Sequence, residues 1–187
     1  PAIDRNTFVK WNVYNQDKMK KIFDEADHIV ELSLKNHRIV TNPMEPRGLI
    51  AEWDMSNDFY TLYGSTQNIH VMRNSISDML GISNESVRFI APDVGGGFGA
   101  KNFCYTEYGL IAWASKKIQR PVKWIASRSE GFLSDHQGRD HQSESCLALR
   151  KDGKILALHV KSYANLGAYM VGSAGGVQVV QYANLPG

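Results

Sequence analysis

Apolar side chains recur at helical spacing in three parts of the chain. They predict a helix over residues 17–26, with Asp17 as its N-cap, and a second over 67–80 that Gly81 ends. A more uniformly apolar stretch, 104–117, predicts a largely buried helix whose last residues are lysines, as the helix dipole favours.

Shorter apolar or alternating runs predict β-strands. Their expected ranges are 29–40, 49–54, 60–66, 87–91, 122–126, 140–150 and 155–164. We expect 122–126 to be buried, and Asp152 with Gly153 suits a tight turn between the last two strands. Strand–helix–strand units occur beside this antiparallel hairpin, so the sequence predicts an α+β fold with a mixed β-sheet and packed helices. Residues 1–15 are expected to be an irregular lead-in.

Composition and charge exclude several classes of protein. With 43% hydrophobic and 21% charged residues, the chain is ordinary for a globular protein. Its 21 basic and 19 acidic residues are spread out without a basic stripe, so we expect no nucleic-acid partner. No apolar run approaches the roughly 20 residues that a membrane span needs. The two cysteines, Cys104 and Cys146, form no CxxC pair, which fits a reducing compartment and predicts a cytoplasmic protein.

The most unusual stretch is 94–101, VGGGFGAK, between a predicted strand and a predicted helix. It fits the dinucleotide-binding fingerprint only if Ala100 serves as the third small residue, and no acidic residue follows at the expected distance. The P-loop pattern fails because Asn102 follows Lys101. Two interpretations stay open: a tight turn forced by close packing, or a loop whose N–H groups hold a polar or anionic ligand. Phe98, between two glycines, favours a loop that faces a cavity.

Residues 65–68, STQN, lie where a predicted strand ends and a predicted helix begins. Ser65 or Thr66 is expected to cap that helix. Gln67 has an alternative role, in which its amide NH₂ donates a hydrogen bond to a ligand oxygen.

Arg139 also admits two interpretations. It pairs with Asp135 or Asp140 at the surface, or it presents its planar guanidinium to a substrate. Cys104, within a predicted apolar helix, is interpreted as a core residue. The histidines show no metal-ligand spacing, so the sequence predicts no zinc site.

Seven motifs occur in one order along the chain. They are MEPRG at 44–48, STQN at 65–68, VGGGFGAK at 94–101, RPVKW at 120–124, SRSE at 127–130, GRD at 138–140 and DGKI at 152–155. Together they resemble the molybdenum hydroxylases: the xanthine dehydrogenase, aldehyde oxidase and aerobic carbon monoxide dehydrogenase family. RPVKW, SRSE and GRD look most similar to the carbon monoxide dehydrogenase-like branch. The resemblance implies that 16–187 is part of a molybdopterin-binding domain, from the first quarter of a large subunit.

The resemblance implies a molybdenum centre held by a pterin, with a cytosine dinucleotide form expected in bacterial members. In that family the pterin supplies the sulfur ligands, and the protein acts from around the metal. Gln67 matches the glutamine that hydrogen-bonds a molybdenum oxo group. Gly96, Gly97, Phe98 and Gly99 match the loop that passes the metal and pterin. Gln67 and Phe98 would therefore lie next to the metal's own ligands.

A substrate class and partners are implied in the same way. The parent enzyme would oxidise aldehydes, heteroaromatics or carbon monoxide with water-derived oxygen, and pass electrons to iron–sulfur and flavin centres. Iron–sulfur clusters need groups of cysteines, so we expect those centres on partner subunits or other segments. Asn102 replaces the glutamate of purine-oxidising members, which argues against purines. Arg139 falls one residue away from the arginine that binds purines, so Asn102 and Arg139 are candidate substrate residues.

The general base of the family is a glutamate near the far end of a much longer subunit, and no position here matches it. We therefore expect no catalytic residue in this chain and no turnover by the chain alone. We also expect self-association, because apolar surface that the rest of the subunit would cover stays exposed. The alternative is a non-catalytic module that binds a nucleotide or anion, or a structural α+β module.

Overall fold

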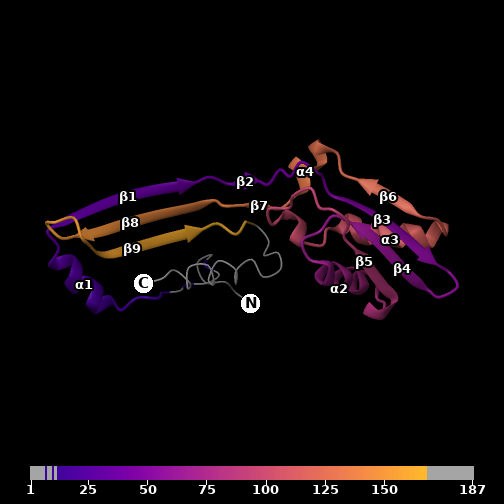
Figure 1. The fold of residues 1–187 in the computed structure, drawn as a ribbon, viewed down its shortest axis with the longest axis horizontal. Coiled ribbons are helices and arrows are strands. Elements are labelled where there is room, and N and C mark those ends of the chain that lie inside the picture. Colours follow the sequence, from indigo (N-terminus) through magenta and orange to yellow (C-terminus); the bar gives the residue numbers. More distant parts are fainter. Residues whose placement is uncertain (1–6, 8–9, 11, 168–187) are drawn as a thin grey trace. The chain divides into compact units, whose positions relative to one another are not determined.

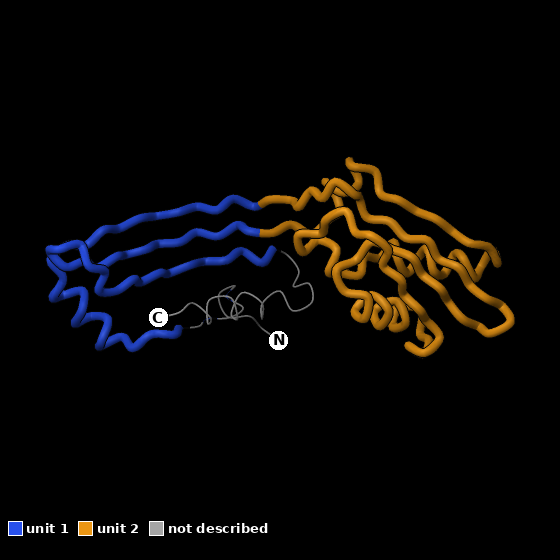
Figure 2. The backbone as a smooth tube through the Cα atoms, in the orientation of Figure 1, with its two compact units in different colours: residues 1–38, 139–187 blue, residues 39–138 orange. Residues whose placement is uncertain are grey.

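The structure is a computed structural model that describes residues 7, 10 and 12–167 (Figure 1). The chain divides into two compact units, one made of residues 1–38 with 139–187 and the other of residues 39–138 (Figure 2). None of the described helices is long and apolar enough to cross a membrane.

The first unit contains a three-stranded antiparallel sheet in the order β1-β8-β9. Its strands are β1 (His28–Asn36), β8 (His141–Leu149) and β9 (Ile155–Ala164). The helix α1 (Gln16–Asp24) contacts β9. The predicted hairpin is confirmed, because β8 and β9 pair directly and Gly153 has the positive φ of 83° that the turn requires.

The second unit contains a four-stranded mixed sheet in the order β5-β4-β3-β6. Its strands are β3 (Gly48–Asp54), β4 (Phe59–Gly64), β5 (Val87–Ile90) and β6 (Val122–Ile125). β4 and β5 are parallel, whereas β3 is antiparallel to both β4 and β6. A short pair, β2 (Ile39–Val40) with β7 (Gln137–Gly138), lies at the two ends of this unit's sequence.

Two helices, α2 (Ile69–Leu80) and α3 (Thr106–Ile118), pack on the mixed sheet. Buried side chains alternate along β3 and β4, as expected for strands with one face against helices. The buried core comprises Leu49, Ala51, Tyr60, Leu62, Met72, Ile76, Val87, Phe89, Tyr105, Tyr108 and Ala112. Fully burying a side chain such as Leu62 contributes roughly 1.5–3 kcal/mol, so this core holds the sheet and the helices in one unit.

The remaining elements are short: η2 (Asn84–Ser86), η3 (Ala100–Asn102) and α4 (Arg128–Ser134). The predicted α+β class, with a mixed sheet, packed helices and a hairpin, is confirmed. The predicted boundary between residues 15 and 16 stays a prediction.

Several local predictions were wrong. The N-cap of α1 is Asn15, whose side chain accepts the Lys18 N–H, and not Asp17, which lies in the first turn. The strand predicted over 29–40 is two strands, because β1 ends at Asn36 before the short β2. β6 is not buried: it lies at the edge of its sheet and alternates between half-buried and exposed residues.

Candidate cofactor-binding site

The glycine loop, residues 94–99, leads from β5 to η3 and is fastened at both ends to one carboxylate. Glu45 Oε2 accepts hydrogen bonds from the Gly95 N–H at 2.8 Å and from Lys101 Nζ at 2.7 Å. A third bond comes from Ser65 Oγ at 2.5 Å. The same oxygen therefore joins three of the seven motifs, MEPRG, STQN and VGGGFGAK. Sequence reasoning quoted all three motifs but missed Glu45 and Lys101 as members of the site.

The first three residues of STQN hold the glycine loop, Gln67 directly and Ser65 and Thr66 through Glu45 and Lys101. Ser65 reaches it through Glu45, and the Thr66 hydroxyl donates to the Lys101 carbonyl at 3.0 Å. The expected cap at Ser65 or Thr66 was wrong, because the side chain that caps α2 is Asn68, which accepts the Val71 N–H. The residues before the helix are thus used to hold the loop.

Gln67 is fixed in one orientation by the loop. Its carboxamide Oε1 accepts the Gly99 N–H at 2.8 Å, and its own backbone N–H donates to the Lys101 carbonyl at 3.1 Å. Because the oxygen is committed to an amide donor, the NH₂ end of the carboxamide of this exposed residue is left as a donor for a ligand. This arrangement agrees with the donor role expected for Gln67.

Three successive amide groups of the loop are unpaired within the part of the chain that the structure describes. The N–H groups of Gly96, Gly97 and Phe98 have no hydrogen-bond acceptor among the described residues, although Gly97 is buried. Buried backbone N–H groups are almost always paired in native proteins. Successive N–H groups in a chain with left-handed residues form a concave site for anions or polar oxygens, so the loop can hold such a ligand.

Close packing and backbone conformation together explain the glycines of the loop. A Cβ at position 95 would lie 2.5 Å from Glu45 Cβ, so this position requires glycine for packing. Gly96 and Gly99 have φ values of 90° and 93°, which other residues rarely adopt. Around Gly99 an added Cβ would meet no atom within 4 Å, so packing alone does not account for this glycine.

Phe98 is not explained by packing. It has a left-handed φ of 50°, yet its side chain is 75% exposed. A left-handed aromatic residue is strained, and such strain gathers at functional sites. An exposed apolar ring beside three unpaired amides presents a surface for a ligand with both polar and flat apolar parts.

The two candidate substrate residues lie in different places. Asn102 ends η3, directly after Lys101, and its side chain is exposed without a hydrogen bond to any described residue. Arg139 lies in the first unit, outside the unit that carries the loop. Its expected surface pairing was wrong, because Asp135 pairs with Arg47 and Asp140 pairs with Arg38.

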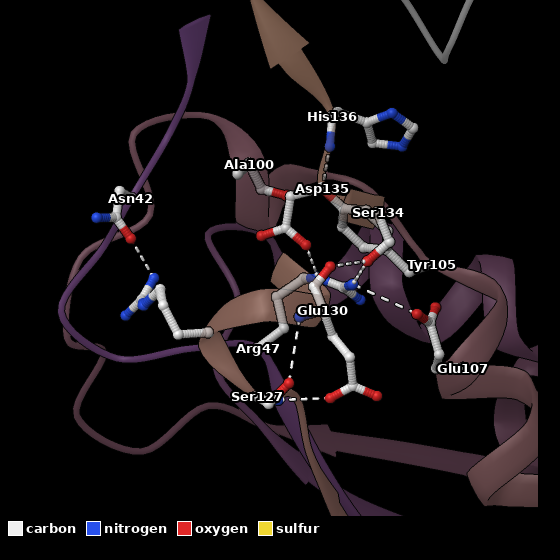
Figure 3. A network of polar contacts seen from close by, with 11 residues as sticks. Asn42, Arg47, Ala100, Tyr105, Glu107, Ser127, Glu130, Ser134, Asp135 and His136 are labelled. Atoms are coloured by element: carbon white, nitrogen blue, oxygen red, sulfur yellow. Dashed lines mark hydrogen bonds and ion pairs between the residues drawn. The ribbon is translucent and has the colours of Figure 1, made fainter. Parts of the chain in front are cut away.

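Arg47, the next charged residue of MEPRG, is almost completely buried (Figure 3). Its Nε donates to Asp135 at 2.6 Å, and its Nη2 contacts Ser134 at 3.0 Å and Glu107 at 3.4 Å. Burial acts to lower the pKa of Arg47, but the two carboxylates outweigh it and raise that pKa. Its guanidinium carbon also lies 3.7 Å from the centre of the Tyr105 ring.

Arg47 and Tyr105 connect the loop to the segment before β7. The Tyr105 hydroxyl donates to the Ala100 carbonyl at 2.9 Å and accepts the His136 N–H at 3.2 Å (Figure 3). The His136 ring stacks on Tyr105, with 4.8 Å between the ring centres. The end of the glycine loop is therefore braced by a buried polar network that no local sequence signal predicted.

The motif SRSE has a structural role. Ser127 and Glu130 form a capping box at the start of α4, in which each side chain bonds the other's backbone N–H. Arg128 extends from this helix to Asn42 and to the carbonyl groups of Pro43 and Met44. It holds the chain that leads into Glu45.

Cys104 was wrongly placed inside a helix, since α3 begins at Thr106. It nevertheless packs against the core, as expected. Burial raises the pKa of its thiol to about 11, so the group stays protonated near neutral pH and is a poor nucleophile.

Several known proteins are similar to this chain in sequence. Residues 3–185 match the profile of the family described as "Molybdopterin cofactor-binding domain". The carbon monoxide dehydrogenase large chain of Afipia carboxidovorans is 32% identical over 164 residues, covering 88% of this chain and 20% of that protein. The nicotine 6-hydroxylase large subunit of Paenarthrobacter nicotinovorans is 32% identical over 147 residues, covering 79% of this chain and 18% of that protein.

The fold is shared as well. The crystal structure of quinoline 2-oxidoreductase from Pseudomonas putida 86 matches with a TM-score of 0.70 and 31% identity, over 77% of this chain and 18% of that one. The chain thus spans about a fifth of the length of these relatives. The resemblance that the seven motifs carried is confirmed, and the chain belongs to the molybdopterin cofactor-binding domain family of the molybdenum hydroxylases.

Proposed function

We propose that this chain is the molybdopterin-binding part of a longer oxidoreductase subunit, and that the glycine loop with Gln67 contacts the cofactor. The observation that carries the proposal is a row of three amides, at Gly96, Gly97 and Phe98, that have no acceptor among the described residues and lie beside the carboxamide NH₂ of Gln67. These are donors only, and they suit a group rich in acceptor oxygens. A turn built only for packing would have no reason to leave them unpaired.

Each residue has a separate role in this proposal. The amides of Gly96, Gly97 and Phe98 would hold acceptor atoms of the cofactor. Gln67 would donate through its NH₂ while its oxygen keeps Gly99 in place. The exposed Phe98 ring would cover the cofactor and keep water from it, so that Gln67 and Phe98 border the metal.

When bound, the molybdenum–pterin group would supply the redox centre at which a substrate is oxidised with water-derived oxygen. We place the cytosine dinucleotide form of the pterin here, and the iron–sulfur and flavin centres on partner subunits. The glutamate that acts as general base would lie in the rest of the subunit. We therefore expect the chain alone to turn over no substrate. We also propose that the enzyme is cytoplasmic.

The proposed substrates are aldehydes, nitrogen heteroaromatics or carbon monoxide. The names of similar proteins span these classes: a carbon monoxide dehydrogenase, a nicotine 6-hydroxylase and an indole-3-acetaldehyde oxidase. Asn102, exposed directly after the loop, would contact the substrate as a neutral amide. Arg139 and Asp140 are consecutive left-handed residues with φ of 68° and 63°, and the Arg139 side chain has no bond to a described residue, which supports a substrate role.

The test is to purify the complete subunit with its partners and to measure molybdenum, pterin and nucleotide per subunit. Gln67→Glu is the sharpest variant, because it keeps an oxygen for Gly99 and replaces the donor NH₂ by a negatively charged acceptor oxygen. We expect wild type to contain molybdenum and pterin, and Gln67→Glu to contain several-fold less or to lose activity. Asn57→Asp, on an exposed turn, is the matched control and should change neither.

Wild-type protein without molybdenum and pterin would overturn the proposal. It would favour the alternative, a non-catalytic module that binds a nucleotide or anion or serves a structural purpose. If the cofactor is present, assays with an aldehyde, a nitrogen heteroaromatic and carbon monoxide decide among the three substrate classes. Turnover by the 187-residue chain alone would contradict the expectation that the general base lies elsewhere.

A further inference from the structure

Glu45 and Lys101 form a charged pair under the glycine loop. The Lys101 side chain is 0% exposed, and its ammonium lies 2.7 Å from the Glu45 carboxylate, which is 39% exposed. Removing an ammonium from water is unfavourable by several kcal/mol unless a counter-charge compensates. A loop that served only as a turn would place this lysine in solvent, so the buried position requires another explanation.

Glu45 and Lys101 hold the start of the glycine loop and the residues that follow its end. The Gly95 N–H, at the start, and Lys101 Nζ, after the end, donate to the same oxygen of Glu45. The Glu45 N–H donates back to the Gly95 carbonyl at 3.3 Å, so the start of the loop is held by two bonds. The distance that the five intervening residues, 96–100, must span is therefore fixed.

Lys101 also connects the loop to Gln67. Its carbonyl accepts the Gln67 N–H at 3.1 Å and the Thr66 hydroxyl at 3.0 Å. The side chain of this lysine thus fixes the loop, while its backbone fixes the residue that would donate to the cofactor. If Lys101 moved, the unpaired amides and the Gln67 NH₂ would move relative to each other.

The protonation state of Glu45 agrees with this role. Burial acts to raise the pKa of Glu45, but hydrogen bonds from Lys101, Ser65 and Gly95 outweigh it and lower that pKa. The carboxylate is therefore ionised at neutral pH and can accept all three donors.

We infer that Glu45 and Lys101 are a positioning pair, which holds the amides of residues 96–98 and the carboxamide of Gln67 in the arrangement that binds the cofactor. This inference rests on the proposed function for the identity of the ligand. Neither side chain needs to touch the cofactor or the substrate. Their effect passes through the loop backbone.

The experiment compares wild type with Glu45→Gln and Lys101→Met in the complete protein. The first readout is amide hydrogen exchange of residues 95–101, measured against that of β8 and β9 as an internal reference. We expect exchange in the loop to become faster by about tenfold or more, the scale of losing hydrogen bonds to a charged group, while β8 and β9 stay unchanged. The second readout is molybdenum and pterin per subunit, which should fall several-fold in both variants.

Three further variants separate positioning from general damage. The double variant Glu45→Gln with Lys101→Met leaves no unpaired buried charge, so its loop exchange should increase by less than the two single effects combined. Glu52→Gln, an exposed carboxylate on β3 of the same unit, is the control and should behave as wild type. If the single variants do not fold, Ser65→Ala removes one of the three donors to Glu45 and should give a smaller change of the same kind.

The outcomes are distinct. Unchanged loop exchange in Glu45→Gln overturns the inference, and so does faster loop exchange with unchanged cofactor content. Wild-type protein that lacks molybdenum and pterin overturns the proposed function and the cofactor part of the inference. The exchange readout needs no cofactor and still decides whether the pair fixes the loop.

Discussion

Gly97 and Gln67 lie so close that a Cβ atom added at residue 97 would be 2.5 Å from the Gln67 carboxamide oxygen. The group that would have to give way is the flexible end of the Gln67 side chain, and not a backbone segment. The Gly97→Ala change should therefore displace Gln67 and break its bond with the Gly99 N–H. We expect a loss of stability of about 1 kcal/mol or less, the net worth of one hydrogen bond, but a several-fold loss of bound molybdenum.

Thermal unfolding and metal analysis of the complete protein measure these two effects separately. Gly131→Ala is the matched control, because its added Cβ meets its nearest atom at 3.6 Å and lies in α4. This control should be neutral or stabilising by up to about 1 kcal/mol, with full cofactor content. Normal molybdenum content in Gly97→Ala would contradict the role given to Gln67.

Arg47→Met should be among the most destabilising substitutions in the second unit. The change leaves Asp135 without its partner in a site where the arginine is 1% exposed. Breaking a buried ion pair by removing one member typically lowers the free energy of unfolding by about 3–5 kcal/mol. Arg150→Met, at an exposed pair with Asp152, should lower it far less, because solvent screens a pair at the surface. Urea unfolding of the complete protein checks both, and similar effects for the two variants would refute the prediction.

The stability of the protein should depend on pH in part through the ionisation of the Glu45 carboxylate. Its pKa is lower in the folded state than the ordinary glutamate value of about 4.3. The unfolded chain then binds the proton more readily, so the contribution of Glu45 is present above that ordinary value and disappears as pH falls through the folded pKa. Denaturation midpoints of wild type and Glu45→Gln should differ most near neutral pH and converge in acid. Two curves that stay parallel from neutral pH into acid would show that the carboxylate is not responsible.

The sequence allowed the local parts of the fold to be predicted. The Asp152–Gly153 turn and the Gly81 helix end depend on the conformations of single residues, and both are present in the structure. Periodicity could not place β6 at a sheet edge, because the position of a strand within a sheet depends on pairing with distant residues. For the same reason, the residues that hold the glycine loop from elsewhere in the chain were harder to predict than the loop itself.

The contacts that hold the site lie far apart in sequence. Lys101 and Glu45 are 56 residues apart, and Arg47 and Asp135 are 88 residues apart. No periodic pattern links such residues, and each would read as an ordinary surface charge. For Glu45, Arg47 and Lys101 the only signal was their presence in MEPRG and VGGGFGAK, whereas Asp135 lies in none of the seven motifs. Glu45 lies between Pro43 and Pro46, which restrict the backbone around it.

The sheet of the first unit has an apolar face that should make the 187-residue chain self-associate. Val30, Leu147 and Leu158 lie directly opposite one another, and residues opposite in antiparallel strands share a face. Leu32 and Val160 lie in the next row of the same face, 55% and 43% exposed. Apolar patches of this kind promote association between proteins.

Leu32→Lys places a charge on that face, in the edge strand β1, and should shift the chain towards monomer in size-exclusion chromatography with light scattering over a range of concentrations. Ser33→Lys is the matched control, because the neighbouring residue of a strand points to the opposite face. The control should associate as wild type does, since it adds the same charge outside the apolar face. A wild-type chain that is monomeric at all concentrations would refute self-association, and equal effects of both lysines would show that net charge, and not this face, controls it.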